Sequence, residues 1–156
     1  MENISNHITW KEATNSNTAT RRGIDNTPNS SQLKNMRALA DYVFEPLRIW
    51  VGGSIKINSF FRSPELNKAI GGSTTSQHCA ENGAAIDVDD NYGHKTNAEM
   101  FHYIKDNMDF DQLIWEYGTD ENPNWVHVSF KNDGHNRKQV LKVERIDGKA
   151  KYTTWQ

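Results

Sequence analysis

The stretch QLIWEYGTDENPNWVHVSF, residues 112–130, holds two apolar runs separated by turn-forming residues. The runs 112–117 and 125–130 are rich in β-branched and aromatic residues and predict two strands, while the linker 118–124 predicts the turn that joins them. Strands joined in this way pair in antiparallel fashion. This stretch therefore favours a mostly antiparallel sheet.

A long helix is predicted before these strands. Apolar residues recur at three- and four-residue steps over 31–50, which is the spacing of one helical face. Pro46 should kink or interrupt this helix, and Gly52 should end it. The remaining pattern predicts short helices at 10–13, 64–70 and 97–108, and strands at 54–61 and 84–88.

The chain is expected to end in a hairpin. Residues 139–146 and 149–154 read as strands, and Asp147-Gly148 between them is a strong turn signal. Helices that precede and alternate with mostly antiparallel strands indicate an α+β fold, in which helices pack on one face of a small sheet. The other face of such a sheet is free to carry a site.

The domain organisation is predicted to be simple. A length of 156 residues fits one domain with one core. Residues 1–30 are rich in Ser, Thr and Asn and are expected to form an N-terminal arm, with 15–29 as a loop. Residues 31–156 are expected to form the single folded domain.

Composition excludes several classes of protein. The net charge of -2 leaves no electrostatic footprint for nucleic acid. The sequence has no apolar run long enough to span a membrane, and its first residues lack the basic and apolar regions of a secretory signal. Cys79 is the only cysteine, so no internal disulfide can form, and we expect it to be a structural thiol.

Three segments carry residues suited to chemistry: SQHCAENGAAID at 76–87, WVHVS at 125–129 and FFRSPELN at 60–67. The first two supply two imidazoles and a carboxylate, from His78, His127 and Asp87. This donor set suits zinc and leaves a fourth position open for water. Zinc in such a site makes water a usable nucleophile at neutral pH.

These segments resemble the zinc D-Ala-D-Ala carboxypeptidase family, whose relatives include D-alanyl-D-alanine dipeptidases, L-alanyl-D-glutamate endolysins of phages and the hedgehog signalling domain. The resemblance covers about residues 31–143 and implies a fold like that of hedgehog and the D-Ala-D-Ala peptidases. The family pattern is S-x-H, then G-x-A-x-D, and later a histidine on a strand, with an R-S-P-x-x-N run upstream. The matching residues are Ser76, His78, Gly83, Ala85, Asp87, His127 and the run 62–67.

The resemblance implies a function and roles for residues. It implies zinc held by His78, Asp87 and His127, and zinc-dependent hydrolysis of peptidoglycan stem peptides by a D-Ala-D-Ala carboxypeptidase or an endolysin-type endopeptidase. Arg62 would hold the substrate's carbonyl or carboxylate, and Ser76 and Gln77 would contact the substrate. We expect a monomer that acts on the cell wall, which an endolysin made without a signal peptide reaches through a holin pore.

The loop between the first two ligands departs from the family pattern. Gly83 lies five residues after His78, whereas the usual gap is three. The extra length falls in a loop, which tolerates insertion, so His78 and Asp87 can still converge. Asp89 and Asp90 are alternative ligands, although the G-x-A-x-D frame favours Asp87.

Position 124 departs from the pattern in a way that bears on catalysis. Family members commonly carry, three residues before the last histidine, an acid that acts as general base, and here that residue is Asn124. An amide cannot take up the proton of water. Glu116 is the best substitute, because a hairpin places its strand beside that of His127, whereas Asp120 and Glu121 lie in the connecting loop. The alternatives are an engineered change at this position, a catalytically inactive zinc-containing module that binds cell-wall peptides, and a structural zinc domain.

Overall fold

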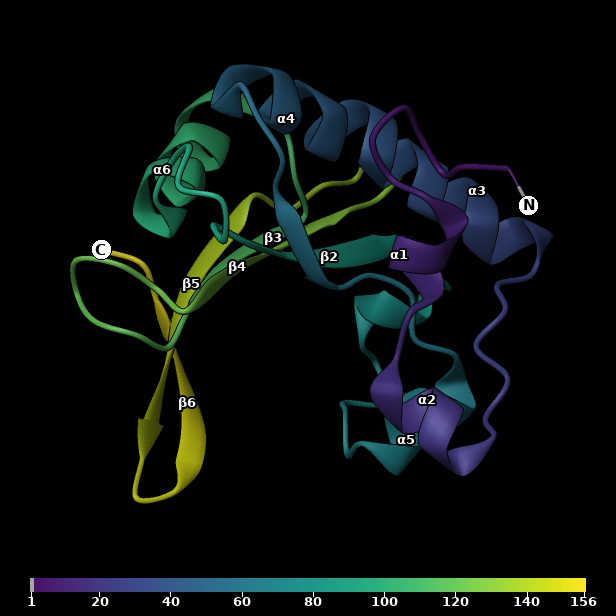
Figure 1. Cartoon of the computed structure of the whole chain (residues 1–156). Helices are drawn as coiled ribbons and strands as arrows, with labels where there is room; N and C mark the ends of the chain where they lie inside the picture. Colours follow the sequence, from purple (N-terminus) through teal and green to yellow (C-terminus); the bar gives the residue numbers. More distant parts are fainter. Residues whose placement is uncertain (1) are drawn as a thin grey trace.

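The computed structural model, which describes residues 2–156, is organised around a six-stranded sheet (Figure 1). The strand order is β1-β2-β4-β3-β5-β6, and every neighbouring pair is antiparallel except β3 and β5, which are parallel. The predicted α+β fold with a mostly antiparallel sheet is confirmed. The strands are β1 Lys56–Ser59, β2 Ala84–Asp89, β3 Gln112–Glu116, β4 Trp125–Phe130, β5 Gln139–Ile146 and β6 Lys149–Thr154.

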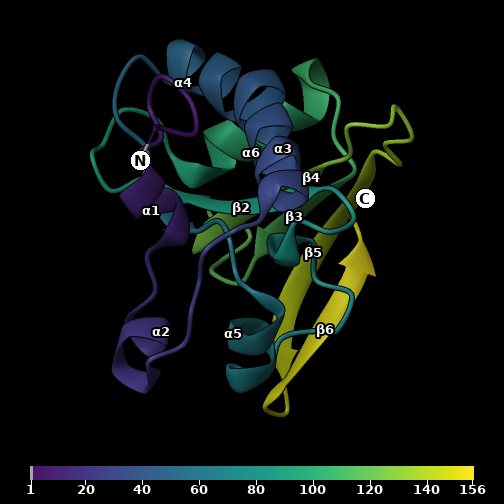
Figure 2. The same cartoon turned by 90° about the vertical axis from the view of Figure 1, so that its right-hand side faces the viewer.

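The helices lie in two groups. Helices α3, α4 and α6 cover one face of the sheet, whereas α5 and the β5–β6 hairpin extend on its other side, as Figure 2 also shows. None of the helices in residues 2–156 combines the length and apolar character needed to cross a membrane. The helices are α1 Trp10–Thr14, α2 Asn17–Arg22, α3 Ser30–Leu39, α4 Glu45–Val51, α5 Pro64–Ala69 and α6 Asn97–Asn107, with a π-helix η1 Ala40–Phe44 and a 3-10 helix η2 Gln77–Cys79.

The predicted long helix is confirmed, with a π-helical turn inside it. Asn29 begins α3 through a capping box with Gln32, and Gly52 ends α4 in the left-handed conformation, at φ 80°. The π-helix η1 directly precedes α4, and Pro46 lies in the first turn of α4. Because proline lacks an N–H and its ring crowds the preceding turn, the helix widens here instead of ending.

The N-terminal residues contain more structure than the sequence predicted. Residues 15–29, expected as a loop, include helix α2, which Ser16 caps at its start and Gly23 ends with a left-handed φ of 65°. Ile8 and Ala13 are buried in the main hydrophobic core. The boundary between arm and domain at residue 30 stays a prediction.

The core lies between the helix layer and one face of the sheet. Alternate residues of a strand point to opposite faces, so the apolar residues of β2, β3 and β4 at every second position face α3 and α6. Their burial against helical side chains such as Leu39 and Phe101 supplies the main apolar contact of the fold. The core-facing strand residues are Ile86, Val88, Leu113, Trp115, Val126 and Val128.

The intervening residues of the same strands face the opposite side. Asp87 on β2 pairs with His127 on β4, and His127 pairs with Ile114 on β3. Glu116 lies two residues further along β3, so it shares this face. Sheet register therefore sets two of the predicted metal ligands and the predicted base on the face that the main helix layer leaves open.

Candidate metal and catalytic site

Three predicted ligands meet on the open face of the sheet. His78 Nε2 lies 3.3 Å from Asp87 Oδ2, and His127 Nδ1 lies 3.0 Å from Asp87 Oδ1. The ligand atoms of the three residues all lie within 4.8 Å of one another. Two of the residues are cross-strand partners, and the third comes from η2. This arrangement can hold a metal ion.

The His78 side chain is fixed by its backbone neighbours. It is 2% exposed, and its Nδ1 lies 2.8 Å from the carbonyl oxygen of Phe60. A carbonyl only accepts hydrogen bonds, so Nδ1 carries the proton of the neutral imidazole, and Nε2, on the side of Asp87, is the nitrogen free to bind a metal. A second hydrogen bond of this kind is what orients metal-binding histidines in proteins.

The longer loop between His78 and Asp87 is accommodated by two left-handed residues. Ala80 ends η2 at φ 57°, and Gly83 enters β2 at φ 87°. A Cβ at Gly83 would lie 2.7 Å from the carbonyl oxygen of Phe130, so only glycine fits both the conformation and the space. The predicted insertion is thus absorbed before β2 begins.

The protonation preferences of the three residues suit a cation. Burial lowers the pKa of His78, which favours the neutral imidazole that binds metals. Burial raises the pKa of Asp87, but the charges and hydrogen bonds of the two histidines outweigh it and hold that pKa well below its usual range. Burial lowers the pKa of His127, yet Asp87 raises it more, so a metal ion and a proton compete at His127.

The alternative ligands lie elsewhere. Asp89 accepts a hydrogen bond of 2.9 Å from Asn97 Nδ2, and Asp90 accepts one of 2.8 Å from the backbone N–H of Gly93. Within residues 2–156, His78, Asp87 and His127 form the one group of His, Cys, Asp or Glu side chains with metal-binding geometry. The geometry thus favours Asp87 over Asp89 and Asp90 as a ligand, in agreement with the G-x-A-x-D pattern of the sequence.

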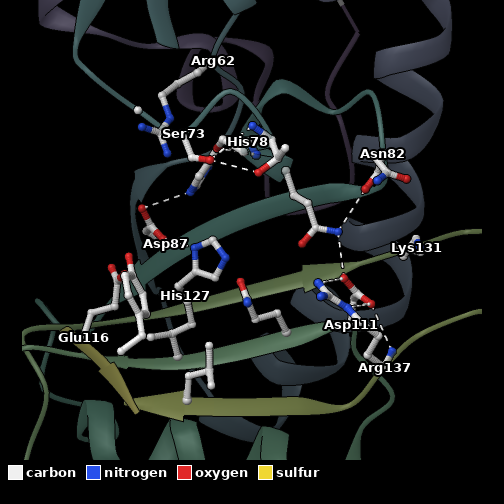
Figure 3. A pocket seen from close by; sticks show the side chains of 18 of the residues that line it. Arg62, Ser73, His78, Asn82, Asp87, Asp111, Glu116, His127, Lys131 and Arg137 are labelled. Carbon is white, nitrogen blue, oxygen red and sulfur yellow. Dashed lines mark hydrogen bonds and ion pairs between the residues drawn. The ribbon is translucent and has the colours of Figure 1, made fainter. Parts of the chain in front are cut away.

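An open pocket of about 800 Å³ surrounds this group (Figure 3). One side of it is formed by the sheet and another by the loop from Gly71 to His78. Its volume suits a short peptide segment. Besides the three predicted ligands, the charged residues that line it are Arg62, Asp111, Glu116, Lys131 and Arg137.

Comparison with known families agrees with this geometry. A family model described as Peptidase M15 matches residues 6–129, which is most of the chain. The chain belongs to the peptidase M15 family. Members of this family are generally zinc-dependent, and the His-Asp-His group gives this M15 chain a site that could bind the metal. A search among curated proteins found no match.

Glu116 is the carboxylate that this M15 chain places in the pocket beside the predicted ligands. Burial raises the pKa of Glu116 to about 6, and the nearby His127 opposes that rise. Trp125, its cross-strand partner, donates a hydrogen bond from its indole N–H to Glu116 Oε2. A half-buried carboxyl group with a pKa close to neutrality can accept and release a proton at physiological pH.

Asn124 lies outside this pocket. Its side chain is exposed, its backbone N–H donates to the Glu116 carbonyl at 2.9 Å, and its own carbonyl accepts from Asn97 Nδ2 at 3.1 Å. Asp120 is paired with Lys142, and Glu121 is exposed on the loop, so neither lines the pocket. Among the carboxylates weighed from the sequence as base, Glu116 alone lines it.

The three predicted substrate-binding residues all line the pocket, but they differ in which of their polar atoms are already hydrogen-bonded. Arg62 lines the pocket and its guanidinium forms no ion pair with any residue of 2–156, so it can take a ligand, although its Nε is itself buried. The Ser76 hydroxyl caps η2 by accepting the N–H of His78 at 3.3 Å. Gln77 Nε2 donates to Asn82 O at 3.0 Å and to Asp111 Oδ2 at 2.9 Å, which leaves its Oε1 as an acceptor.

Sequence reasoning missed the four other ionisable side chains of the pocket, those of Asp111, Lys131, Arg137 and Tyr152. Asp111 precedes β3 and reads as a strand-end residue, and Lys131 and Arg137 lie in a polar loop. Tyr152 lies on β6 opposite Val143, which itself pairs with Glu116, so the tyrosine shares the open face. No local pattern marked them, because only the strand order β4-β3-β5-β6 brings them to the site.

Proposed function

We propose that this chain is a zinc-dependent peptidase that hydrolyses the stem peptides of peptidoglycan. One observation carries the proposal: a His-Asp-His group and a carboxylate of raised pKa lie on one open sheet face and line one pocket. Membership of the M15 family supports the peptidase class. The motifs shared with D-Ala-D-Ala carboxypeptidases support the peptidoglycan substrate and action at the cell wall.

The donor set fits zinc. Two imidazoles and one carboxylate match the ligands of catalytic zinc sites, and His78 already has its second nitrogen engaged by a carbonyl. When bound, zinc supplies a Lewis acid that polarises a carbonyl and makes water a nucleophile at neutral pH. The protein must then supply a proton acceptor and groups that hold the substrate.

Glu116 is assigned as the proton acceptor. It takes a proton from the attacking water and can deliver that proton to the amine of the departing peptide. Its raised pKa allows both steps, since a carboxyl group with a pKa of about 6 exchanges protons readily near neutrality. The indole N–H of Trp125 holds one carboxylate oxygen and leaves the other for water.

Arg62 is assigned to the substrate. Its guanidinium lines the pocket and forms no ion pair among residues 2–156, so a peptide carbonyl or a terminal carboxylate can bind it there. The backbone N–H of Arg62 donates to His78 O at 3.0 Å, so the residue is tied to the metal-binding loop. A fixed cation at this place would stabilise the negative charge that develops on the carbonyl oxygen.

A second candidate is a zinc-containing module that binds cell-wall peptides without cutting them. Asn124, at the position where relatives commonly carry the base, is the observation that favours it. On that reading Glu116 is a strand carboxylate held by Trp125 and plays no part in proton transfer.

Peptidoglycan digestion separates the two candidates. Purified peptidoglycan is incubated with the protein, with and without a chelator, and new amino groups are counted for the wild type, Glu116→Gln and Asn124→Asp. Glu121→Gln, which removes an exposed carboxylate outside the pocket, is the matched control. The peptidase proposal expects chelator-sensitive release by the wild type and the control, and almost none by Glu116→Gln. Release by Asn124→Asp alone would support the binding module.

A further inference from the structure

The pocket has a second charged region, which the proposed chemistry does not use. Figure 3 shows Lys131, Asp111 and Arg137 on the side of the pocket opposite Glu116. Lys131 and Arg137 lie after residue 129, where the match to the M15 family ends. Because β5 pairs in parallel with β3, the loop that connects β4 to β5 and contains both residues returns to the pocket.

Arg137 is held in a fixed position by a buried carboxylate. The Asp111 side chain is 1% exposed, and Arg137 donates to it from Nε at 3.0 Å, from Nη2 at 2.7 Å and from its backbone N–H at 3.0 Å. Gln77 Nε2 donates to the same carboxylate at 2.9 Å. Four hydrogen bonds satisfy Asp111, so it needs no ligand and serves to orient Arg137 and Gln77.

The outer edge of the group formed by Asp111, Arg137 and Lys131 remains available to an anion. The Arg137 side chain is 55% exposed, and its Nη1 takes no part in the contacts with Asp111. Lys131 lines the same pocket and forms no ion pair with any residue of the described range 2–156. Its stem lies against Gly83, where an added Cβ would be 3.0 Å from Lys131 Cγ. The residues that line this end of the pocket carry two cations and one buried carboxylate, so the lining itself is positive. Outside the lining, Asp133 lies close enough to Lys131 for the lysine to help lower the pKa of the Asp133 carboxyl.

We propose that Lys131 and Arg137 form a subsite for a carboxylate that the peptide substrate carries away from its scissile bond. The inference rests on the proposed function, which sets the scissile bond at the metal-binding group. Besides its C-terminal carboxylate, a stem peptide offers two candidates: the free α-carboxylate of γ-linked D-glutamate and the side-chain carboxylate of diaminopimelate. Gln77 precedes His78 in the chain and donates to Asp111, so its free Oε1 can accept a peptide N–H beside this subsite.

Binding of defined peptides tests the subsite without relying on turnover. The zinc-loaded Glu116→Gln protein is titrated by calorimetry with L-Ala-γ-D-Glu-L-Lys-D-Ala and with the same peptide amidated at the glutamate α-carboxylate. A third peptide carries diaminopimelate in place of lysine. We expect at least one free carboxylate to tighten binding about tenfold, as charge-assisted hydrogen bonds do, and salt to reduce that gain.

Variants test whether Lys131 and Arg137 cause the tighter binding of the peptide with a free carboxylate. Lys131→Gln should remove most of the preference for the acidic peptide. Lys138→Gln is the matched control, because Lys138 Nζ lies over the Phe110 ring and does not line the pocket, so it should keep the preference. Arg137→Gln combined with Asp111→Asn removes a buried charge together with its partner and should also abolish the preference. Lys131→Gln decides the matter if the double variant does not fold.

The outcomes separate the subsite from the peptidase proposal. The subsite would be overturned if neither the glutamate α-carboxylate nor the diaminopimelate carboxylate tightens binding, if no peptide binds, or if Lys131→Gln leaves the preference unchanged. A preference that depends on Lys131, in a protein whose wild type cleaves none of the peptides, would support the subsite and contradict the peptidase. The peptide that shows the preference identifies which carboxylate is recognised.

Discussion

The two faces of the sheet, built from the same strands, perform different tasks. On β4, Val126 and Val128 are fully buried against the helix layer, while His127 between them turns to the pocket. On β3, Trp115 packs in the core and Glu116 next to it lines the pocket. The alternation predicts that changes at neighbouring residues of one strand can disrupt stability and chemistry separately.

The largest expected effect comes from the open face of β4. His127→Ala removes a predicted metal ligand, so we expect zinc to be lost and hydrolysis to fall below detection, with the fold retained. Metal analysis and a thermal melt of the same sample measure both. Val128→Ala, one residue away, is the matched control: it should keep zinc and lower the free energy of unfolding by roughly 2 kcal/mol. Loss of zinc in Val128→Ala but not in His127→Ala would contradict the account.

The next effect comes from the open face of β3. Glu116→Gln preserves shape and removes the proton acceptor, so kcat should fall by about 10²- to 10⁴-fold. Zinc content should stay unchanged, because Glu116 is not among the three grouped ligands. A steady-state assay on zinc-loaded protein measures the fall, and a variant that retains more than half of the wild-type kcat would exclude Glu116 as the base.

The covered face of β3 gives a change of stability. Trp115 is 1% exposed and packs on Phe101, so Trp115→Ala should lower the free energy of unfolding by about 3–5 kcal/mol. Denaturant unfolding followed by circular dichroism measures this loss. Glu116→Gln, as the neighbouring control, should change it by less than about 1 kcal/mol. Equal losses of unfolding free energy in the two variants would contradict the assignment of stability to one face and chemistry to the other.

The smallest effect is a displacement of the pH profile. A carboxylate base acts only when deprotonated, so the rate should rise with pH through the pKa of Glu116, which is about 6 and which bound zinc lowers. Trp125→Phe removes a hydrogen bond that favours the charged form, so the pKa should rise and the ascending limb should move to higher pH. Trp50→Phe, on α4, should leave the limb in place. A shift to lower pH in Trp125→Phe would contradict the assigned contact.

Much of the fold followed from local sequence signals. Asp147-Gly148 gave the last hairpin the bounds that the structure has, because a two-residue turn fixes its register. Thr96 and Glu99 form the capping box that starts α6. In contrast, helix α2 was missed, since its few apolar residues form no stripe, although Ser16 and Gly23 are cap signals at its two ends.

The site was predictable where a motif or a hairpin carried it. The motifs named His78, Asp87 and His127, and the hairpin placed Glu116 beside the strand of His127. The subsite of Lys131 and Arg137 was out of reach, because it depends on a parallel pairing of β5 with β3 across a long stretch of chain. No spacing in the sequence links Asp111 to Arg137, whose contact forms only when that strand order is fixed.

A crystal structure of the zinc-soaked protein, with anomalous differences recorded at the zinc edge, tests the central claim most directly. We predict one strong peak on the open face, within about 2.0–2.2 Å of His78 Nε2, an Asp87 carboxylate oxygen and His127 Nδ1. The peak should vanish in His127→Ala. No peak at this group, or a peak at other residues only, would contradict the assignment of this face as the zinc centre.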